Sequence, residues 1–218
     1  MSKISGIGMT SQRARNRLVE KIRLMGITNE KILEVIRLTP RHFFLEEALA
    51  SRAYDNTALP IGYGQTISQP YMVASMTQIL CETGSMGKVL EVGSGCGYQT
   101  VILSAFADKV FAVERIQALV KRLRSNLYEL KIPNVKLRHL DGFNGWSEHA
   151  PFDAILVAAA PVGVPEKLLE QLAVGGRMVI PIGSAKSQEL RLIKKSNTGF
   201  QEQVLDNVSF VPLLDGIE

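Results

Sequence analysis

Hydrophobic residues recur with two different periods along the chain, and the change falls near residue 84. Before it the spacing is helical: we expect helices over residues 10–25, 29–38 and 69–83, with a short helical continuation over 40–49. Gly26 stops the first helix, Asn29 caps the second, and Pro70 lies in the first turn of the third, where its missing N–H does no harm. The segment 58–70, ALPIGYGQTISQP, follows no helical period and is expected to be a loop.

After residue 84, short apolar runs alternate with amphipathic ones. We expect strands over 88–92, 109–114, 135–140, 152–159 and 176–183, with helices over 98–107, 116–130 and 165–172. Two further strand-like runs, 188–195 and 203–213, follow without a helical pattern between them. Regular alternation predicts a parallel sheet with helices on both faces, and the final pair predicts an antiparallel edge.

These patterns predict an α/β fold: a Rossmann-like, doubly wound, mostly parallel sheet with an antiparallel edge and an added helical amino-terminal segment. We expect a single domain over residues 1–218, in which 1–83 form the helical part with the loop 58–70, and 84–218 form the α/β core. A chain of 218 residues is long enough for one such domain.

Composition narrows the class of protein. The 46% apolar and 21% charged residues are typical of a soluble globular protein. The longest nearly apolar run, 154–165, is too short for a bilayer, and the amino terminus lacks the apolar core of a secretory signal. Cys81 and Cys96 form no disulfide framework, and no metal-ligand spacing is present. We expect a cytoplasmic protein with no metal and no membrane contact.

Positive charge is concentrated at the amino terminus, where residues 1–41 hold nine lysines and arginines against three glutamates. One interpretation is an arm that binds nucleic acid. The alternative is the solvated face of an amphipathic helix, which we favour because Leu18, Ile22 and Met25 recur at helical spacing between the charges. No aromatic residues interleave with the charges to stack on bases. We therefore expect no nucleic-acid partner.

A glycine-rich turn, EVGSGCG, follows the first strand of the alternating part. Gly93, Gly95 and Gly97 let the backbone turn tightly and approach a ligand closely. The dinucleotide fingerprint G-x-G-x-x-G would need a glycine at position 98, which is Tyr98. This departure disfavours a pyrophosphate site.

Acidic residues stand at the ends of the neighbouring strands. Glu91 lies just before the glycines, and Glu114 ends the next strand, where a carboxylate can accept hydrogen bonds from the two hydroxyls of a ribose. Asp141, before Gly142, could accept a hydrogen bond from an adenine amino group. Together they suit a ligand with adenine and ribose but no phosphate. The alternative is that Glu114 pairs with Arg115 or a neighbouring basic residue on the surface.

This arrangement resembles the class I S-adenosylmethionine-dependent methyltransferases. The matching stretches are VLEVGSGCGY, VFAVERI, FDAILVAAA and LLEQLAVGGRMVIPIG, within residues 88–183. The resemblance implies S-adenosyl-L-methionine as the cofactor.

The methyl acceptor has to be inferred from what the chain lacks. The run VAAAPVG after the fourth expected strand offers nothing polar to hold an exocyclic amine. Neither cysteine is placed as a nucleophile, and His42, His139 and His149 are scattered. A carboxylate acceptor is already ionised at neutral pH, so the enzyme need only align it and exclude water. The uncharged segment 58–70 suits that task.

That segment, ALPIGYGQTISQPYMVA, is very similar to a signature of the protein-L-isoaspartate O-methyltransferase family. PRHFF, AYDNTALPIG and SFVPLL match as well, so the resemblance runs from about Gly26 to the end. It implies methyl transfer to the α-carboxyl of L-isoaspartyl residues in proteins and peptides. The ester then closes to a succinimide, whose hydrolysis partly restores aspartate. We expect a monomer.

The resemblance also implies roles for particular residues. Ser68 would be the active-site residue, and Ile61, Val211 and Leu213 would contact the substrate. The implied cofactor contacts are Gln65, Thr66, Ile67, Glu91, Gly93, Gly95, Cys96, Glu114, Arg115, Asp141 and Gly142. An alternative role for Ser68 is the N-cap of the helix that Pro70 begins.

Three other functions remain open from the residues themselves. The chain could be an RNA or small-molecule methyltransferase that uses the basic amino-terminal helix, or an inactive binding module that kept the fold. A nicotinamide oxidoreductase is the weakest of the three because of Tyr98.

Overall fold

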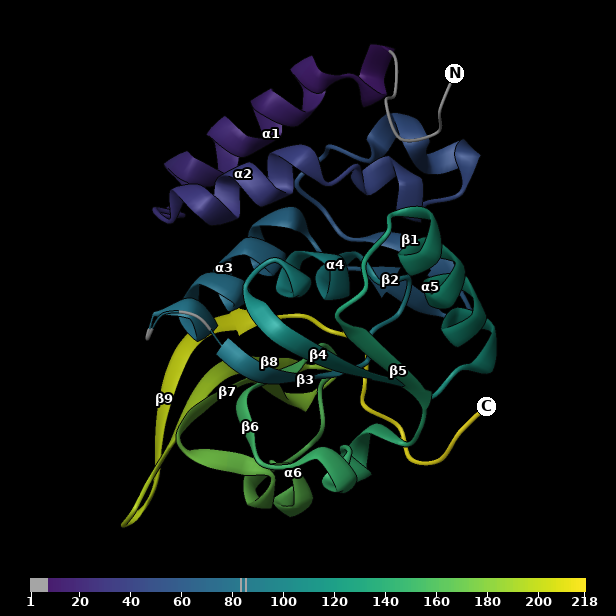
Figure 1. The fold of residues 1–218 in the computed structure, drawn as a ribbon. Helices are drawn as coiled ribbons and strands as arrows, with labels where there is room; N and C mark the ends of the chain where they lie inside the picture. The colour runs from purple at the N-terminus through teal and green to yellow at the C-terminus, as the bar shows by residue number, and fades with distance from the viewer. Residues whose placement is uncertain (1–7, 83, 85) are drawn as a thin grey trace.

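The computed structural model describes residues 8–82, 84 and 86–218. A sheet in the order β5-β4-β3-β6-β7-β8-β9 forms its centre (Figure 1). The strands are β3 (Met86–Val92), β4 (Ala107–Glu114), β5 (Val135–His139), β6 (Phe152–Val157), β7 (Leu172–Ser184), β8 (Ser187–Ser196) and β9 (Gly199–Val208). The first five are mutually parallel, and β8 and β9 are antiparallel. The predicted mostly parallel sheet with an antiparallel edge is confirmed.

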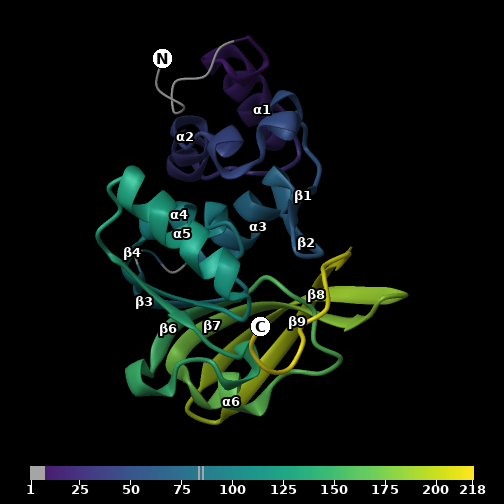
Figure 2. The ribbon, with the colours of Figure 1, turned by 90° about the vertical axis from the view of Figure 1, so that its right-hand side faces the viewer.

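Helices cover both faces of the sheet, as the alternating pattern predicts. One face carries α3 (Pro70–Cys81), α4 (Tyr98–Ser104) and α5 (Gln117–Glu129), and the other carries α6 (Glu166–Glu170) (Figures 1 and 2). Successive residues of β3 point to opposite faces, so Val89 packs under the first set and Leu90 on the other side. No helix in the described part of the chain is long and apolar enough to cross a membrane.

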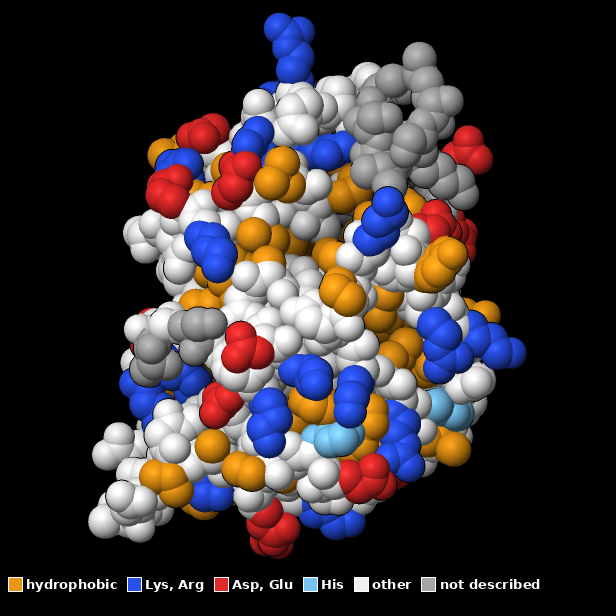
Figure 3. Space-filling view, viewed as in Figure 1, with side chains coloured by type: hydrophobic (Ala, Val, Ile, Leu, Met, Phe, Trp, Pro, Cys, Tyr) orange, Lys and Arg blue, Asp and Glu red, His pale blue; other side chains and the backbone are white. Residues whose placement is uncertain are grey.

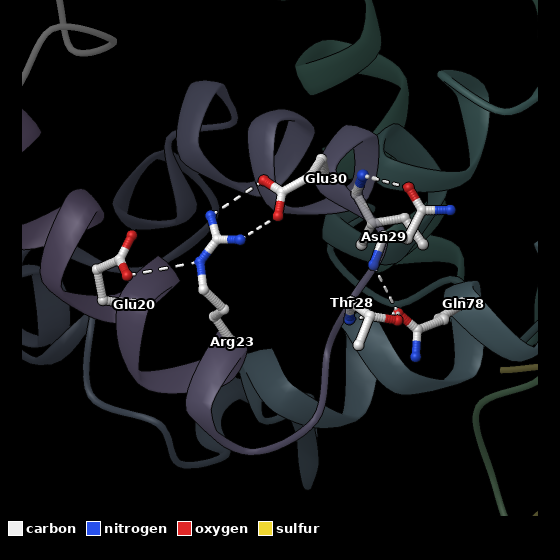
Figure 4. A network of polar contacts seen from close by, with 7 residues as sticks. Glu20, Arg23, Thr28, Asn29, Glu30 and Gln78 are labelled. Atoms are coloured by element: carbon white, nitrogen blue, oxygen red, sulfur yellow. Dashed lines mark hydrogen bonds and ion pairs between the residues drawn. The ribbon is translucent and has the colours of Figure 1, made fainter.

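The amino-terminal helices α1 (Gln12–Leu24) and α2 (Glu30–Leu38) lie beyond α3, away from the sheet (Figures 1 and 2). Polar contacts fix the joint between the three helices (Figure 4). Arg23 of α1 donates to Glu30 of α2, and Gln78 of α3 accepts from the backbone N–H of Thr28 at 2.9 Å and of Asn29 at 3.0 Å. Asn29 caps α2, as predicted, by accepting from the N–H of Ile32.

One hydrophobic core connects the helical part to the sheet. It contains Leu18 and Ile22 of α1 and Ile32 of α2 together with Val89 of β3. This shared core supports the single-domain prediction, which remains a prediction. The expected end of the third helix at Thr83 lies outside the described residues. Short 3₁₀ turns complete the fold: η1 (Gly8–Thr10), η2 (Arg41–Phe44), η3 (Glu47–Arg52), η4 (Gly142–Asn144) and η5 (Ser147–His149).

The segment 58–70 is a β-hairpin rather than the expected loop. β1 (Leu59–Gly62) pairs antiparallel with β2 (Gln65–Ile67), in a two-stranded sheet of its own. The turn residues Gly62, Tyr63 and Gly64 all have positive φ, and the two glycines adopt that conformation without a steric clash of a side chain. Leu59, Ile61 and Ile67 are buried, so an alternating pattern was present but was hidden by Pro60 and the glycines.

Residues 203–213 are not one strand, which corrects a second expectation. β9 ends at Val208, opposite Gln188 of β8, and the chain then leaves the sheet. The Gln188 side chain ends the ladder because its amide donates to the carbonyl of Phe210 and accepts from the Phe210 N–H. Residues 209–214 cross to β6, where Pro212 bridges to Ala160. The helix expected over 165–172 is also shorter, since β7 already begins at Leu172.

Candidate active site

The candidate site lies where the order of strands reverses. β3 has β4 on one side and β6 on the other, and ligands bind beyond the carboxyl ends of strands at such a point. A cavity opens there. Its lining comes from the hairpin end, the strand ends and the carboxy-terminal segment: Gln65–Ser68, Val73, Val92–Cys96, Tyr98, Gln99, Val113–Arg115, Gly142, Ala158, Ala159 and Val211–Leu214.

The glycine-rich turn forms one wall of this cavity. Gly95 has φ +54°, and a Cβ there would lie 3.3 Å from Cδ1 of Ile61. Gly97 has φ +92° and does not line the cavity; a Cβ there would lie 2.1 Å from Cδ1 of Leu123 on α5. Gly97 therefore lets α4 and α5 pack closely. Asn126 of α5 holds the turn from behind by donating to the carbonyl of Cys96.

Glu114 is buried at the cavity wall, with its carboxylate bonded to backbone N–H groups. One oxygen accepts from Gly95 at 2.9 Å and the other from Ile116 at 3.0 Å. Each carboxylate oxygen has a second lone pair, which can accept a ribose hydroxyl. The alternative surface pair with Arg115 is wrong, because Arg115 forms its ion pair with Glu218 at 3.0 Å.

Asp141 and Gly142 differ in their position relative to the cavity. Asp141 is not among the lining residues; its oxygens accept from the N–H groups of Phe143 and Gly216, the second at 3.0 Å. It thereby fastens the carboxy-terminal tail beside the cavity. Gly142 does line the cavity, and a Cβ there would lie 2.6 Å from Cγ1 of Val92.

Glu91 lies behind the cavity rather than in its wall. Its side chain is 0% exposed, and neither carboxyl oxygen makes a hydrogen bond of ordinary geometry in the described part of the chain. Burial raises the pKa of Glu91 to about 8, although the nearby Thr100 hydroxyl lowers it. Glu91 therefore favours the protonated form in the cofactor-free protein. Its role as a cofactor ligand stays a prediction.

Two buried hydroxyls in the cavity wall fit an adenosyl ligand with several polar groups. Ser94 Oγ and the Tyr98 hydroxyl have no hydrogen-bond partner among the described residues, and both residues are among those that line the cavity. An unbonded buried hydroxyl costs free energy, so a ligand that bonds it is stabilised. With the Glu114 carboxylate and the glycine turn, these groups match a cofactor of adenine, ribose and an amino-acid end.

A second cavity, of about 630 Å³, lies beside the first. Thr57 to Ala58, Gln69 and the 206–211 segment line it, and four residues line both cavities: Thr66, Ser68, Ala158 and Val211. None of these four side chains is ionisable. Ser68 is therefore where the two cavities meet. Its alternative role as helix cap is wrong, because the N-cap of α3 is Gln69.

The other predicted substrate contacts differ in which cavity they line. Val211 lines both cavities, and Leu213 lines the cofactor cavity alone. Ile61 lines neither; it is buried beneath the glycine turn, near Gly95. Gln65, Thr66 and Ile67 line the first cavity, and their role as cofactor contacts stays a prediction.

The Cys96 thiol and the imidazoles of His42 and His139 are placed for structural rather than catalytic roles. Burial raises the pKa of the Cys96 thiol, which keeps it protonated and unreactive. His42 shares a hydrogen bond with the Tyr54 hydroxyl, and His139 with the carbonyl of Arg115. Within the described residues no three His, Cys, Asp or Glu side chains are grouped to hold a metal.

Sequence reasoning missed several residues of the site. It read Tyr98 only as a departure from a fingerprint, and it did not single out Ser94 or residues 206–208. It also passed over two arginines, Arg41 and Arg122, which support the hairpin. Arg122 of α5 donates to the carbonyls of Ile61 and Phe44. No local pattern marks such contacts, because they join segments far apart in the chain.

Comparison with known proteins agrees with this geometry. Residues 12–218 match the family model for protein-L-isoaspartate(D-aspartate) O-methyltransferase. A relative of that name from Alcanivorax borkumensis is 53% identical over 98% of this chain and 97% of its own. One from Pseudomonas aeruginosa is 54% identical over 95% and 99%.

Solved structures agree as well. A protein-L-isoaspartate O-methyltransferase from Plasmodium falciparum, solved with S-adenosyl-L-homocysteine, has a TM-score of 0.80 and 29% identity, covering 92% of this chain and 98% of that one. Another enzyme of that name has a TM-score of 0.82 and 26% identity, covering 91% of this chain and 65% of that one. The chain belongs to the protein-L-isoaspartate(D-aspartate) O-methyltransferase family.

Proposed function

We infer that this enzyme transfers a methyl group from S-adenosyl-L-methionine to the free α-carboxyl of L-isoaspartyl residues in damaged proteins and peptides. The ester closes to a succinimide, and this starts the repair. The observation that best supports this function is that two cavities meet at Ser68, and that the residues lining both cavities have no ionisable side chain. A carboxylic acid of pKa about 4 is already ionised at neutral pH, so its methylation needs no base from the protein.

The cofactor would occupy the glycine-lined cavity, where it supplies a methyl group on a positively charged sulfur. Glu114 is placed to accept the ribose hydroxyls, while the Ser94 and Tyr98 hydroxyls offer donors to the amino-acid end. Arg115 and Gly142 line the same wall. These positions support the predicted cofactor contacts; Glu91 would act from behind the wall.

The acceptor would lie in the second cavity with its carboxylate at Ser68. The Ser68 hydroxyl can donate a hydrogen bond that orients the attacking oxygen without pairing it so tightly that it stops attacking. The peptide backbone of the substrate would follow the hairpin and the 206–211 segment, which form opposite sides of the cleft. Val211, which lines both cavities, would pack between substrate and cofactor.

Labelled S-adenosylmethionine with an isoaspartyl peptide, beside the same peptide containing ordinary aspartate, tests the function. We expect label in the isoaspartyl peptide only, released by mild base as expected for a methyl ester. Equal labelling of both peptides, or of neither, would reject the function.

We further propose a monomeric cytoplasmic enzyme that binds no nucleic acid. The part of this proposal that concerns nucleic acid is supported near the amino terminus, where acidic and basic side chains lie side by side over α1 and α2 (Figure 3). Arg23 pairs with Glu20 and Glu30, and Arg37 pairs with Glu34. Light scattering gives the oligomeric state, and RNA binding that falls steeply with salt would contradict the proposal.

A further inference from the structure

A buried arginine lies directly behind Ser68. Arg41 is 0% exposed, at the start of η2 (Arg41–Phe44). Its guanidinium donates to three backbone carbonyls: Ala53 at 2.7 Å, Thr57 at 2.9 Å and Ser68 at 3.1 Å. Ala53 and Thr57 precede the hairpin and Ser68 follows it. One side chain therefore ties together the two ends of the segment that forms the acceptor side of the site.

The Arg41 guanidinium is not directly paired with a carboxylate. None of the ion pairs in the described part of the chain includes Arg41, and Asp55 attracts its charge only through space. Tyr98 is also near, with its ring centroid 6.0 Å from the guanidinium carbon. Carbonyl dipoles and an aromatic face stabilise a cation without neutralising it. A buried cation of this kind costs free energy unless a partner or a function compensates for it.

The position of this charge matters for an anionic substrate. The guanidinium is one hydrogen bond away from the backbone of Ser68, the residue at which the two cavities meet. In a weakly screened interior a charge acts well beyond contact distance. An isoaspartyl substrate arrives with a negative carboxylate and leaves as a neutral ester. A positive potential at Ser68 therefore favours the acid over its product and over a neutral amide.

We propose that Arg41 is a positioning and specificity residue for the acceptor. Its fork holds Ser68 in place, and its charge, which forms no salt bridge, selects a free carboxylate. This proposal rests on the proposed function. Two separable effects follow: loss of the fork lowers turnover, and loss of the charge lowers the preference for a carboxylate.

Three variants separate these effects. Arg41→Met removes both fork and charge, and Arg41→Gln removes the charge but keeps a donor for one carbonyl. Arg41→Lys keeps the charge but cannot reach three carbonyls. Arg122→Met is the matched control, since Arg122 donates to the hairpin carbonyl of Ile61 but not to Ser68.

An isoaspartyl peptide and the same peptide with isoasparagine each compete with the methylation of a reference isoaspartyl substrate. The readout is the ratio of their two inhibition constants. The wild-type enzyme should prefer the carboxylate. The ratio should fall about tenfold in Arg41→Met and Arg41→Gln, a loss of about 1.4 kcal/mol in discrimination. Arg41→Lys should keep the ratio while its kcat falls, and Arg122→Met should weaken both peptides equally.

An unchanged ratio in a folded Arg41→Met or Arg41→Gln enzyme would overturn the proposal and leave Arg41 a structural residue. If Arg41→Met does not fold, Arg41→Gln decides. Calorimetry with S-adenosylhomocysteine and circular dichroism show that each variant is folded. If the wild-type enzyme itself fails to label the isoaspartyl peptide, the proposed function fails instead, so the two failures are distinct.

Discussion

The two halves of the site are built in different ways. The cofactor half, residues 92–98 and 113–115, is made of turns that directly follow adjacent parallel strands. The acceptor half, residues 57–69 and 206–211, is made of a hairpin and a segment that leaves the sheet. The first is held by a side chain from the end of a sheet strand, Glu114, and the second by a buried side chain from outside the sheet, Arg41; both bond to backbone groups.

The difference shows which part of the site comes from the topology of the sheet and which part is made by segments outside the sheet. Strand ends at a reversal of strand order form a cavity in any sheet of this topology. The acceptor half needs tethers because its segments have no place in that sheet. α5 serves both halves, since Asn126 supports the glycine turn and Arg122 supports the hairpin. Variants on the two sides should therefore affect different steps.

The largest effect is expected at Glu114. Glu114→Ala removes two hydrogen bonds between a charged acceptor and backbone N–H groups, together with the proposed ribose contact. Affinity for S-adenosylhomocysteine should fall roughly 100-fold, since each of the two proposed bonds from a ribose hydroxyl to the charged carboxylate is worth about 1.5 kcal/mol or more. Calorimetry measures this, with Glu129→Ala on the exposed end of α5 as the control. Affinity within threefold of wild type would remove Glu114 from the cofactor half.

Ser68→Ala should affect the acceptor half alone. We expect kcat to fall by roughly 10- to 100-fold, because one donor that orients the reacting oxygen is lost. Cofactor affinity should stay within about twofold, because the glycine turn and Glu114 are unchanged. Steady-state kinetics and calorimetry check the two halves separately, with Ser125→Ala on the exposed face of α5 as the control. A parallel loss of cofactor affinity would make Ser68 a cofactor ligand.

The smallest effect concerns stability and pH at Glu91. Burial raises its pKa from 4.5 to about 8, so the folded protein keeps a proton that the unfolded chain releases above pH 4.5. The stability that this proton contributes is complete below about pH 4.5 and is lost as pH rises through about 8. Glu91→Gln removes this dependence.

Thermal melts of the cofactor-free enzyme test the Glu91 prediction. Glu91→Gln should melt several degrees above wild type near pH 8 and much closer to it near pH 5, because the stability that the proton contributes is lost between these two pH values. Glu202→Gln, on the exposed strand β9, is the control. A difference between variant and wild type that does not change with pH would show that Glu91 titrates normally.

Much of the cofactor half could be predicted because its signals are local. The apolar runs of β3, β4 and β6 and the glycines between β3 and α4 stand next to one another in the chain. Glu114 was placed correctly because it ends a strand. Glu91 and Asp141 were grouped with it by the same rule, yet neither lines the cavity. The pattern gave the strand ends, but not the direction of each side chain.

The acceptor half could be recognised only through the resemblance to a family. Alternation in the hairpin was hidden by Pro60 and three residues with positive φ. The end of β9 was missed because the side chain of Gln188 closes the ladder, with no glycine or proline at that point to mark it. Such closures depend on a partner strand that the local sequence does not reveal.

The sequence by itself determined the class of fold, the order of strands and helices in the α/β core, the glycine turn and the absence of charged residues within the segment 58–70. Each of these is written in neighbouring residues, since strand and helix periods and turn residues act over a few positions. The tertiary structure alone decided that Arg41 and Arg122 hold the hairpin, that 206–214 complete both cavities, and that Glu114 rather than Asp141 lines the cofactor wall. The physical reason is that buried hydrogen bonds must be satisfied by whichever groups the packed chain brings within reach, and those groups lie far apart in the sequence.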